Sequence, residues 1–186
     1  MHKELPRMDE KFQVLTELGA GDFRHIDGSL IDHLRGTKNL LQQWGATEVL
    51  QDAGLYHAAY GTAGFAESMV STNQRHEIAA IIGESSEEIV YQYCACDRKY
   101  FFARIGNELN PEFKNRFTGE FYYLSPGMLN QLCELTAANE LEIATDNPEF
   151  INKHGSGLRH LFIQMAPYLS VAAQEAIKNI LGDSNA

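Results

Sequence analysis

The chain has 186 residues, and its 25 acidic against 15 basic side chains give a formal net charge of −10. Because a typical domain has about 150 residues, this length indicates one compact domain over residues 1–186. The acidic excess disfavours nucleic acid and anionic membrane surfaces as partners. No stretch approaches the roughly 20 apolar residues of a membrane-spanning helix, and the charged start lacks the apolar segment of a secretory signal. We therefore expect a cytoplasmic protein.

The cysteines form no recognisable redox or metal motif. Cys94 and Cys96 are separated by one residue, whereas redox and zinc motifs have two residues between their cysteines, and Cys133 stands apart. We expect reduced thiols that pack as small hydrophobic side chains.

Helix signals dominate the first half of the chain. Ser29 can cap a helix with Asp32 as its acidic partner, and the apolar residues that follow recur at helical spacing until Gly45. Thr47 is expected to open the next helix, which ends near residues 60–62.

The middle of the chain is less regular. Residues 73–82 indicate a helix that Gly83 ends, and one of the serines at 85–86 is expected to cap a helix that reaches about Asp97. The aromatic-rich stretch 100–123 follows neither the helical nor the strand pattern clearly.

Helical spacing resumes in the second half. Ser125 is expected to cap a helix whose first residue is Pro126, since proline lacks only an N–H that has no helical partner there. Residues 147–148 interrupt the pattern, and residues 154–157 are expected to break it again before a helix over 158–168.

The ends of the chain complete the prediction. Residues 1–20 are expected to form an N-terminal arm or helix, and Ser170 is expected to cap a last helix that ends near residues 181–182. Residues 183–186 are predicted to fray. The fold class is all-α, a single domain of about eight to ten short helices.

Two histidines stand out by their position on helices. His33 lies on the apolar face of the helix after Ser29, and His57 lies near the end of the next helix. Gly54 permits a close approach of the two helices, so an antiparallel pair could bring both imidazoles together. Asp97, at the end of a mostly apolar segment, could add a carboxylate. Two imidazoles and one carboxylate are competent ligands for a divalent transition metal.

A structural interpretation of these residues remains open. A histidine on an apolar helix face is more often a core residue that is hydrogen-bonded to a backbone carbonyl. Asp97 could equally close a helix beside surface ion pairs. Asn139 and Glu140 could form a second polar group of residues, or an exposed helix face.

The order of His33 in IDHLRGT, His57 in AGLYHAAYGT and Asp97 in CACDRKY resembles the HD-domain superfamily of metal-dependent phosphohydrolases and related non-haem iron oxygenases. Its pattern is a histidine on one helix, a His-Asp doublet ending another, and a later aspartate. The segments GSLIDHLRGTKNLLQQWGA and LCELTAANELEI look more specifically like an uncharacterised bacterial family of HD-like domains. The resemblance implies an HD-like helix arrangement and a site for Mn, Fe or Zn.

One residue departs from the family pattern. The aspartate of the doublet, which can bridge two metal ions, is replaced by Ala58. Three outcomes stay open: one metal on His33, His57 and Asp97, a site rebuilt with another ligand such as His25, or no metal at all.

Other residues are candidates for substrate contacts. The position of Arg24 resembles that of an arginine in nucleotide-cleaving relatives, and its guanidinium could hold phosphate or carboxylate. Lys38 and Arg98 could also neutralise a substrate. Tyr60 could donate a proton or orient a ligand, although such a tyrosine more often packs its ring and donates to a carbonyl. Arg24 could equally pair with a surface acid.

The resulting hypothesis is a degenerate HD-like hydrolase, in which one metal activates water against a small phosphorylated or nucleotide-like metabolite. The alternative is a non-catalytic ligand-binding or protein-interaction module on the same fold. A third is a non-haem iron oxygenase. The expected partner is a small molecule, and the sequence is compatible with a homo-oligomer.

Overall fold

The computed structural model describes residues 8–18, 24–25, 28–64 and 67–182. The predictions for residues 1–7 and for the tail 183–186 lie outside these residues. Within residues 1–20, the part that is described from residue 8 onward contains a helix.

The described part of the chain is mainly helical, which confirms the predicted all-α class. Its helices are α1 (Met8–Glu17), α2 (Leu30–Gln43), α3 (Glu48–Tyr56), α4 (Arg75–Ile82), α5 (Glu84–Ala95), α6 (Arg98–Phe102), α7 (Pro126–Ala144), α8 (Pro148–Met165) and α9 (Val171–Leu181). Two antiparallel strand pairs are β1 (Arg24–His25) with β2 (Gly28–Ser29), and β3 (Glu112–Lys114) with β4 (Phe121–Tyr123). Single 3-10 turns are η2 (Thr72–Gln74) and η3 (Ala166–Tyr168).

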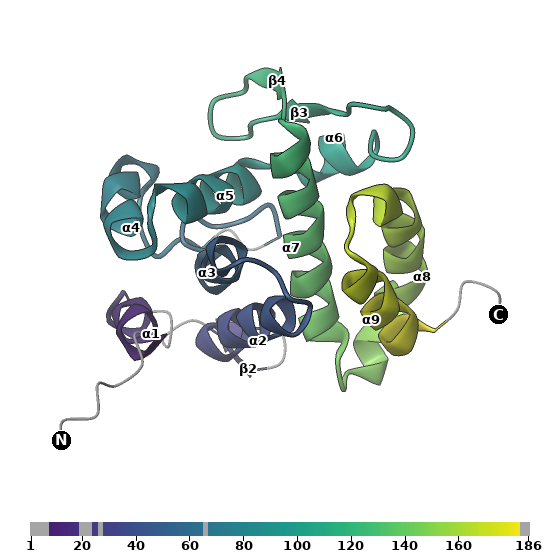
Figure 1. The fold of residues 1–186 in the computed structure, drawn as a ribbon, viewed down its shortest axis with the longest axis horizontal. Helices are drawn as coiled ribbons and strands as arrows, with labels where there is room; N and C mark the ends of the chain where they lie inside the picture. The colour runs from purple at the N-terminus through teal and green to yellow at the C-terminus, as the bar shows by residue number, and fades with distance from the viewer. Residues whose placement is uncertain (1–7, 19–23, 26–27, 65–66, 183–186) are drawn as a thin grey trace.

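Helix α7 runs through the middle of the molecule, with α2, α3 and α5 on one side and α8 and α9 on the other (Figure 1). It contributes to two hydrophobic clusters. Leu135 and Ala138 belong to the cluster formed with α2, α3 and α5, while Leu132 and Leu141 belong to the one formed with α8 and α9. A helix that is apolar on both sides is a core helix, so its polar side chains need partners from neighbouring elements.

Four predicted helix starts are confirmed. The side chains of Ser29, Thr47, Ser125 and Ser170 each accept a hydrogen bond from the backbone N–H three residues ahead. Such a bond satisfies one of the backbone donors that a helix start leaves unpaired. Local sequence therefore fixes where α2, α3, α7 and α9 begin.

The predicted cap at residues 85–86 is wrong. Helix α5 begins at Glu84, and Gly83 ends α4 and precedes α5 with a φ of 86°. This left-handed conformation is accessible to glycine at little cost, so one residue makes the whole connection and the serines lie within the first turn of α5.

The predicted break at residues 154–157 is also wrong, since α8 continues from Pro148 to Met165. A glycine within a helix costs only about 1 kcal/mol relative to alanine, which packing can offset. Gly155 is buried, and a Cβ added there would lie 3.2 Å from Ile151 Cγ2. Asn147 is the N-cap of α8 and Pro148 is its first residue, and both residue types are favoured at these positions.

The aromatic stretch 100–123 contains α6 and the β3–β4 hairpin. Phe113 on β3 is fully buried and packs against Phe101 of α6 and Tyr122 of β4, with ring centroids 5.6 Å and 5.2 Å apart. Its neighbours on the strand, Glu112 and Lys114, are only half-buried, in line with the alternation of side chains along a strand. The hairpin therefore covers one end of the second hydrophobic cluster.

A buried ion pair joins α2 and α3. A Cβ added to Gly54 would lie 2.5 Å from Leu41 Cδ1, which confirms the predicted close approach of the two helices. In the same contact Lys38 Nζ donates to Asp52 Oδ1 at 2.9 Å, and Lys11 of α1 donates to the other carboxylate oxygen. Lys38 is thus part of the core packing.

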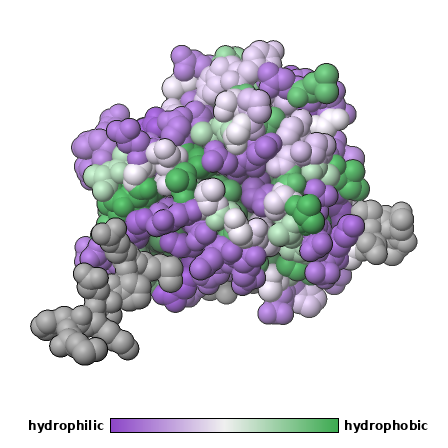
Figure 2. All heavy atoms as spheres, in the orientation of Figure 1, coloured by the Kyte–Doolittle hydropathy of each residue, from purple (hydrophilic) through white to green (hydrophobic). Residues whose placement is uncertain are grey.

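Hydrophilic side chains cover most of the face shown in Figure 2, and hydrophobic ones form separate patches between them. None of the helices in the described ranges is long and apolar enough to cross a bilayer. Cys94, Cys96 and Cys133 are buried free thiols, as expected.

We predict that Asp52→Ala strongly destabilises the fold. It leaves the ammonium group of Lys38 buried without its carboxylate, a change that costs about 3 to 5 kcal/mol in unfolding free energy. Urea denaturation followed by circular dichroism measures this loss. Glu48→Ala is the control, because the 84% exposed Glu48 side chain only approaches Lys11 at 3.8 Å and is expected to cost less than about 0.5 kcal/mol. Equal losses for both variants would contradict the buried ion pair.

Candidate functional site

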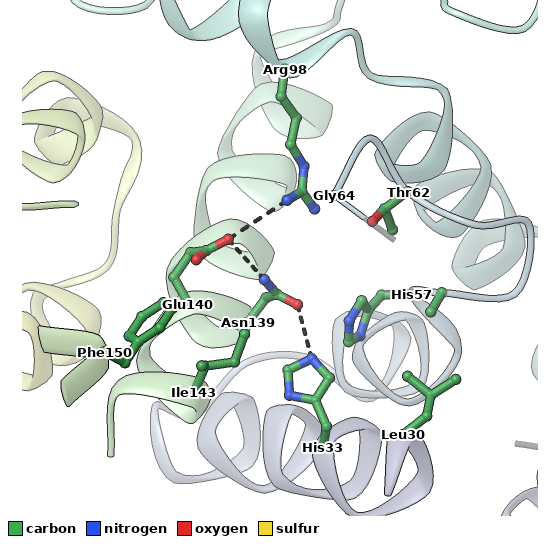
Figure 3. Close-up of a pocket in the computed structure, with 11 residues that line it drawn as sticks. Leu30, His33, His57, Thr62, Gly64, Arg98, Asn139, Glu140, Ile143 and Phe150 are labelled. Carbon is green, nitrogen blue, oxygen red and sulfur yellow. Dashed lines mark hydrogen bonds and ion pairs between the residues drawn. The ribbon is translucent and has the colours of Figure 1, made fainter. Parts of the chain in front are cut away.

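A cavity of about 170 Å³ lies where α2, the end of α3, the start of α6 and the C-terminal part of α7 meet. Its polar wall consists of His33, His57, Thr62, Arg98, Asn139 and Glu140. Its other lining side chains are apolar: Leu30, Ala58, Ile143 and Phe150. Figure 3 shows Arg98 reaching toward the two histidines from the opposite side of the cavity.

Helices α2 and α3 bring the two candidate histidines together. The ring centroids of His33 and His57 lie 5.2 Å apart with an interplanar angle of 84°, an edge-to-face contact. Both side chains are almost fully buried. This is the juxtaposition that the spacing on two packed helices predicts.

The His33 ring is held from both sides by α7. Its Nδ1 contacts a carboxylate oxygen of Glu142, and its Nε2 lies 3.0 Å from Asn139 Oδ1. Asn139 presents its oxygen to the ring because its Nδ2 donates to Glu140 Oε1 at 3.0 Å. Both ring nitrogens of His33 therefore lie against oxygen atoms of α7 side chains.

His57 is oriented by its own helix. Its Nδ1 donates to the carbonyl oxygen of Gly54 at 2.7 Å, which places the Nδ1 proton. The other side of the ring packs edge-on against Tyr93, with centroids 5.5 Å apart. A histidine bound to a backbone carbonyl at a helix end matches the structural interpretation left open by the sequence.

The structure does not bring Asp97 to the histidines. Asp97 is the N-cap of α6: its carboxylate accepts hydrogen bonds from the Tyr100 backbone N–H at 3.2 Å and from Lys114 Nζ at 2.9 Å. The bond from Lys114, together with that from Tyr100, lowers the pKa of the Asp97 carboxyl. Capping α6 directs this side chain toward Lys114, and it does not line the cavity.

The residues present therefore do not fit the predicted mononuclear metal site. Across the part of the chain that the structure describes, no group of three or more His, Cys, Asp or Glu side chains is placed to hold a metal ion. The His33 nitrogens face Glu142 and Asn139, Asp97 binds Lys114, and Ala58 has no donor atom. The backbones of Arg24 and His25 form β1, but their side chains lie outside the described atoms.

Arg98 is the predicted substrate-binding residue that does line the cavity. Its side chain is 19% exposed, and Nη2 donates to Tyr93 Oη at 2.8 Å. Burial raises the pKa of Tyr93, so this hydroxyl stays neutral and accepts the bond. Arg98 Nη1 lies 3.6 Å from Glu140 Oε1, within range of an ion pair but longer than a hydrogen bond (Figure 3).

Two other candidates have structural partners away from the cavity. Lys38 pairs with Asp52 in the α2–α3 contact. Tyr60 donates to Glu87 Oε1 at 2.7 Å, and Arg75 binds the same carboxylate. Burial and this hydrogen bond raise the pKa of the Tyr60 hydroxyl well above its usual value. Neither residue lines the cavity, so the roles predicted for them in substrate binding and proton donation have no geometric basis here.

The role of Glu142 and of the apolar wall is not among the predictions from the sequence. Asn139 and Glu140 are predicted as a polar group, with an exposed helix face as the open alternative. One feature of the sequence indicates a buried position for these polar residues: they lie within a helix that is otherwise apolar on most sides. Such residues need partners, and Asn139 and Glu142, three positions apart, present one face to His33.

Comparisons with known proteins give one match. The profile of a domain of unknown function (DUF6817) matches residues 14–98, a segment that includes His33, His57 and Arg98. No curated protein and no solved structure matches the chain. The match agrees with the expected likeness to an uncharacterised family, and it does not bear on the likeness to HD-domain proteins.

We predict that Tyr60→Phe lowers stability without changing ligand binding. Removing a hydrogen bond to a buried carboxylate costs about 1 to 2 kcal/mol, and Arg75 still compensates the charge of Glu87. Chemical denaturation measures the loss, and Tyr123→Phe is the control because this side chain is exposed. Loss of ligand affinity at unchanged stability would instead place Tyr60 in the site.

Proposed function

We propose that this chain binds a small anionic metabolite in the cavity, with the guanidinium of Arg98 as the anchoring group. One observation carries the proposal: Arg98 is largely buried at the cavity wall, yet within the described residues it donates a single hydrogen bond, to Tyr93. A guanidinium carries five N–H donors in a planar fork, which matches carboxylate and phosphate oxygens. The remaining donors are available to a ligand.

The surroundings of Arg98 support this role. Its contact with the Tyr93 ring, 5.0 Å from guanidinium carbon to ring centroid, fixes its orientation before a ligand binds. The apolar wall of Leu30, Ile143 and Phe150 lowers the local dielectric and so strengthens an ionic contact. A preoriented cation in such a setting loses little conformational freedom on binding.

The size of the cavity limits the ligand. Its volume of about 170 Å³ lies below the roughly 300 to 1,000 Å³ of pockets for drug-sized ligands. At about 30 Å³ for each water molecule in the liquid, it corresponds to roughly six water molecules. A metabolite of a few heavy atoms fits, and a nucleotide would need the cavity to open.

A metal-dependent hydrolase stays a prediction from the sequence resemblance. The arrangement of His33, His57 and Asp97 does not offer a ligand set, so we derive no hydrolytic step from it. Ligand binding needs no metal, which is why the geometry favours the alternative of a binding module.

The test is calorimetric titration of the full chain with acetate, benzoate and inorganic phosphate. We expect at least one of them to bind, and Arg98→Lys to weaken that binding at least about tenfold, because lysine keeps the charge but lacks the fork. Circular dichroism shows whether the variant is folded.

Arg104→Ala is the matched control. Arg104 also stacks on a tyrosine ring, with its guanidinium carbon 3.5 Å from the Tyr100 centroid, but it does not line the cavity. Its loss is expected to leave binding unchanged. Binding that is equal in the native chain and in Arg98→Lys, or no binding of any of the three anions, would overturn the proposal.

A further inference from the structure

We propose that the ligand is a compact monocarboxylate that carries a short aliphatic or single-ring group, and not a phosphate ester. This inference rests on the proposed function and narrows it to one chemical class. It follows from two features of the cavity: a carboxylate already stands beside the anchoring arginine, and apolar side chains line part of the wall away from that arginine.

The charges around the cavity set the charge of the ligand. Arg98 lies beside the Glu140 carboxylate, at 3.6 Å, and His33 contacts the Glu142 carboxylate. Arg98 and His33 are therefore each already in contact with one carboxylate. A phosphate monoester would bring close to two further negative charges into this setting, next to Glu140, whereas a carboxylate brings one.

The hydrogen-bond geometry points the same way. The Glu140 carboxylate lies on one side of the Arg98 guanidinium and Tyr93 Oη accepts from Nη2, so part of the fork is already occupied. A planar carboxylate has two oxygens, and two parallel N–H donors can bind both of them. A phosphate has three terminal oxygens to satisfy, and the carboxylate of Glu140 next to them only accepts hydrogen bonds.

The apolar part of the cavity wall is the reason for expecting a hydrocarbon group on the ligand. Leu30 comes from α2, Ile143 from α7 and Phe150 from α8, and all three line the cavity away from Arg98 (Figure 3). An inorganic anion would leave these side chains in contact with water. A short hydrocarbon group removes that surface from water, which is favourable in proportion to the area covered.

Phe150 sets the length of this group. It is half-buried, and its ring contacts that of His154, one turn further along α8, in a tilted arrangement with centroids 4.8 Å apart. The ring therefore closes the cavity on the side toward α8. Removing it is expected to admit longer acids and to weaken the contact with short ones.

The experiment is a calorimetric series on the full chain with ligands that differ from benzoate in the apolar group or in the head group. Benzoate and acetate differ in the apolar group, and benzoate and phenylphosphonate in the charge and shape of the head group. Benzamide lacks the charge of benzoate and has an N–H donor group in place of one acceptor oxygen. We expect benzoate to bind at least about tenfold more tightly than each of the other three.

Two variants test the two features separately. Glu140→Gln removes the competing carboxylate and is expected to raise the affinity for phenylphosphonate at least about tenfold more than that for benzoate. Phe150→Ala is expected to weaken benzoate binding about tenfold and to leave acetate binding unchanged. Phe121→Ala, at an exposed side chain, is the control and should change neither.

The outcomes separate this inference from the proposed function. If phenylphosphonate or inorganic phosphate binds more tightly than benzoate, and this binding is lost in Arg98→Lys, the inference of a monocarboxylate ligand is overturned. The proposed anion site at Arg98 then still stands. Equal affinities for benzoate and acetate would overturn the inference that the ligand carries an apolar group. If no anion of the series binds, both proposals fail. If Glu140→Gln does not fold, the Phe150→Ala variant and the ligand series on the native chain still test the inference.

Discussion

The side-chain amide of Asn139 is the contact on which the cavity depends. It is buried in the C-terminal part of α7, with its oxygen on His33 of α2 and its nitrogen on Glu140, which in turn faces Arg98 of α6. A buried amide that loses a partner costs about 1 to 3 kcal/mol, so both ends hold their neighbours in place. One residue thereby fixes the relative positions of three helices and directs Arg98 and His33 to one space.

The position of α7 explains why a cavity forms there. The helix packs against two hydrophobic clusters, and its polar residues lie where these clusters meet. Glu134 is satisfied in a different way, since it accepts from the backbone N–H and the hydroxyl of Ser170. At Asn139, Glu140 and Glu142 the partners are side chains of α2 and α6, and these leave room for a small ligand.

Features that depend on residues close together in the chain, such as helix caps, can be predicted from the sequence. Side-chain partners that are far apart in the chain cannot. Caps such as Ser29 and Thr47 are local hydrogen bonds, and Gly54 marks a close helix contact, so α2, α3 and the meeting of His33 with His57 could be foreseen. The orientation of the Asp97 side chain could not be predicted, because its carboxylate binds Lys114 of the later strand β3. The partnership of Glu142 with His33 spans 109 residues and leaves no local signal.

A crystal structure of the chain grown with benzoate tests directly whether Arg98 anchors a monocarboxylate in this cavity. We expect carboxylate oxygens within about 3.0 Å of Arg98 nitrogens and the ring against Phe150, with Asn139 still bridging His33 and Glu140. Benzoate that is bound elsewhere, or a cavity that holds only water at saturating benzoate, would contradict it.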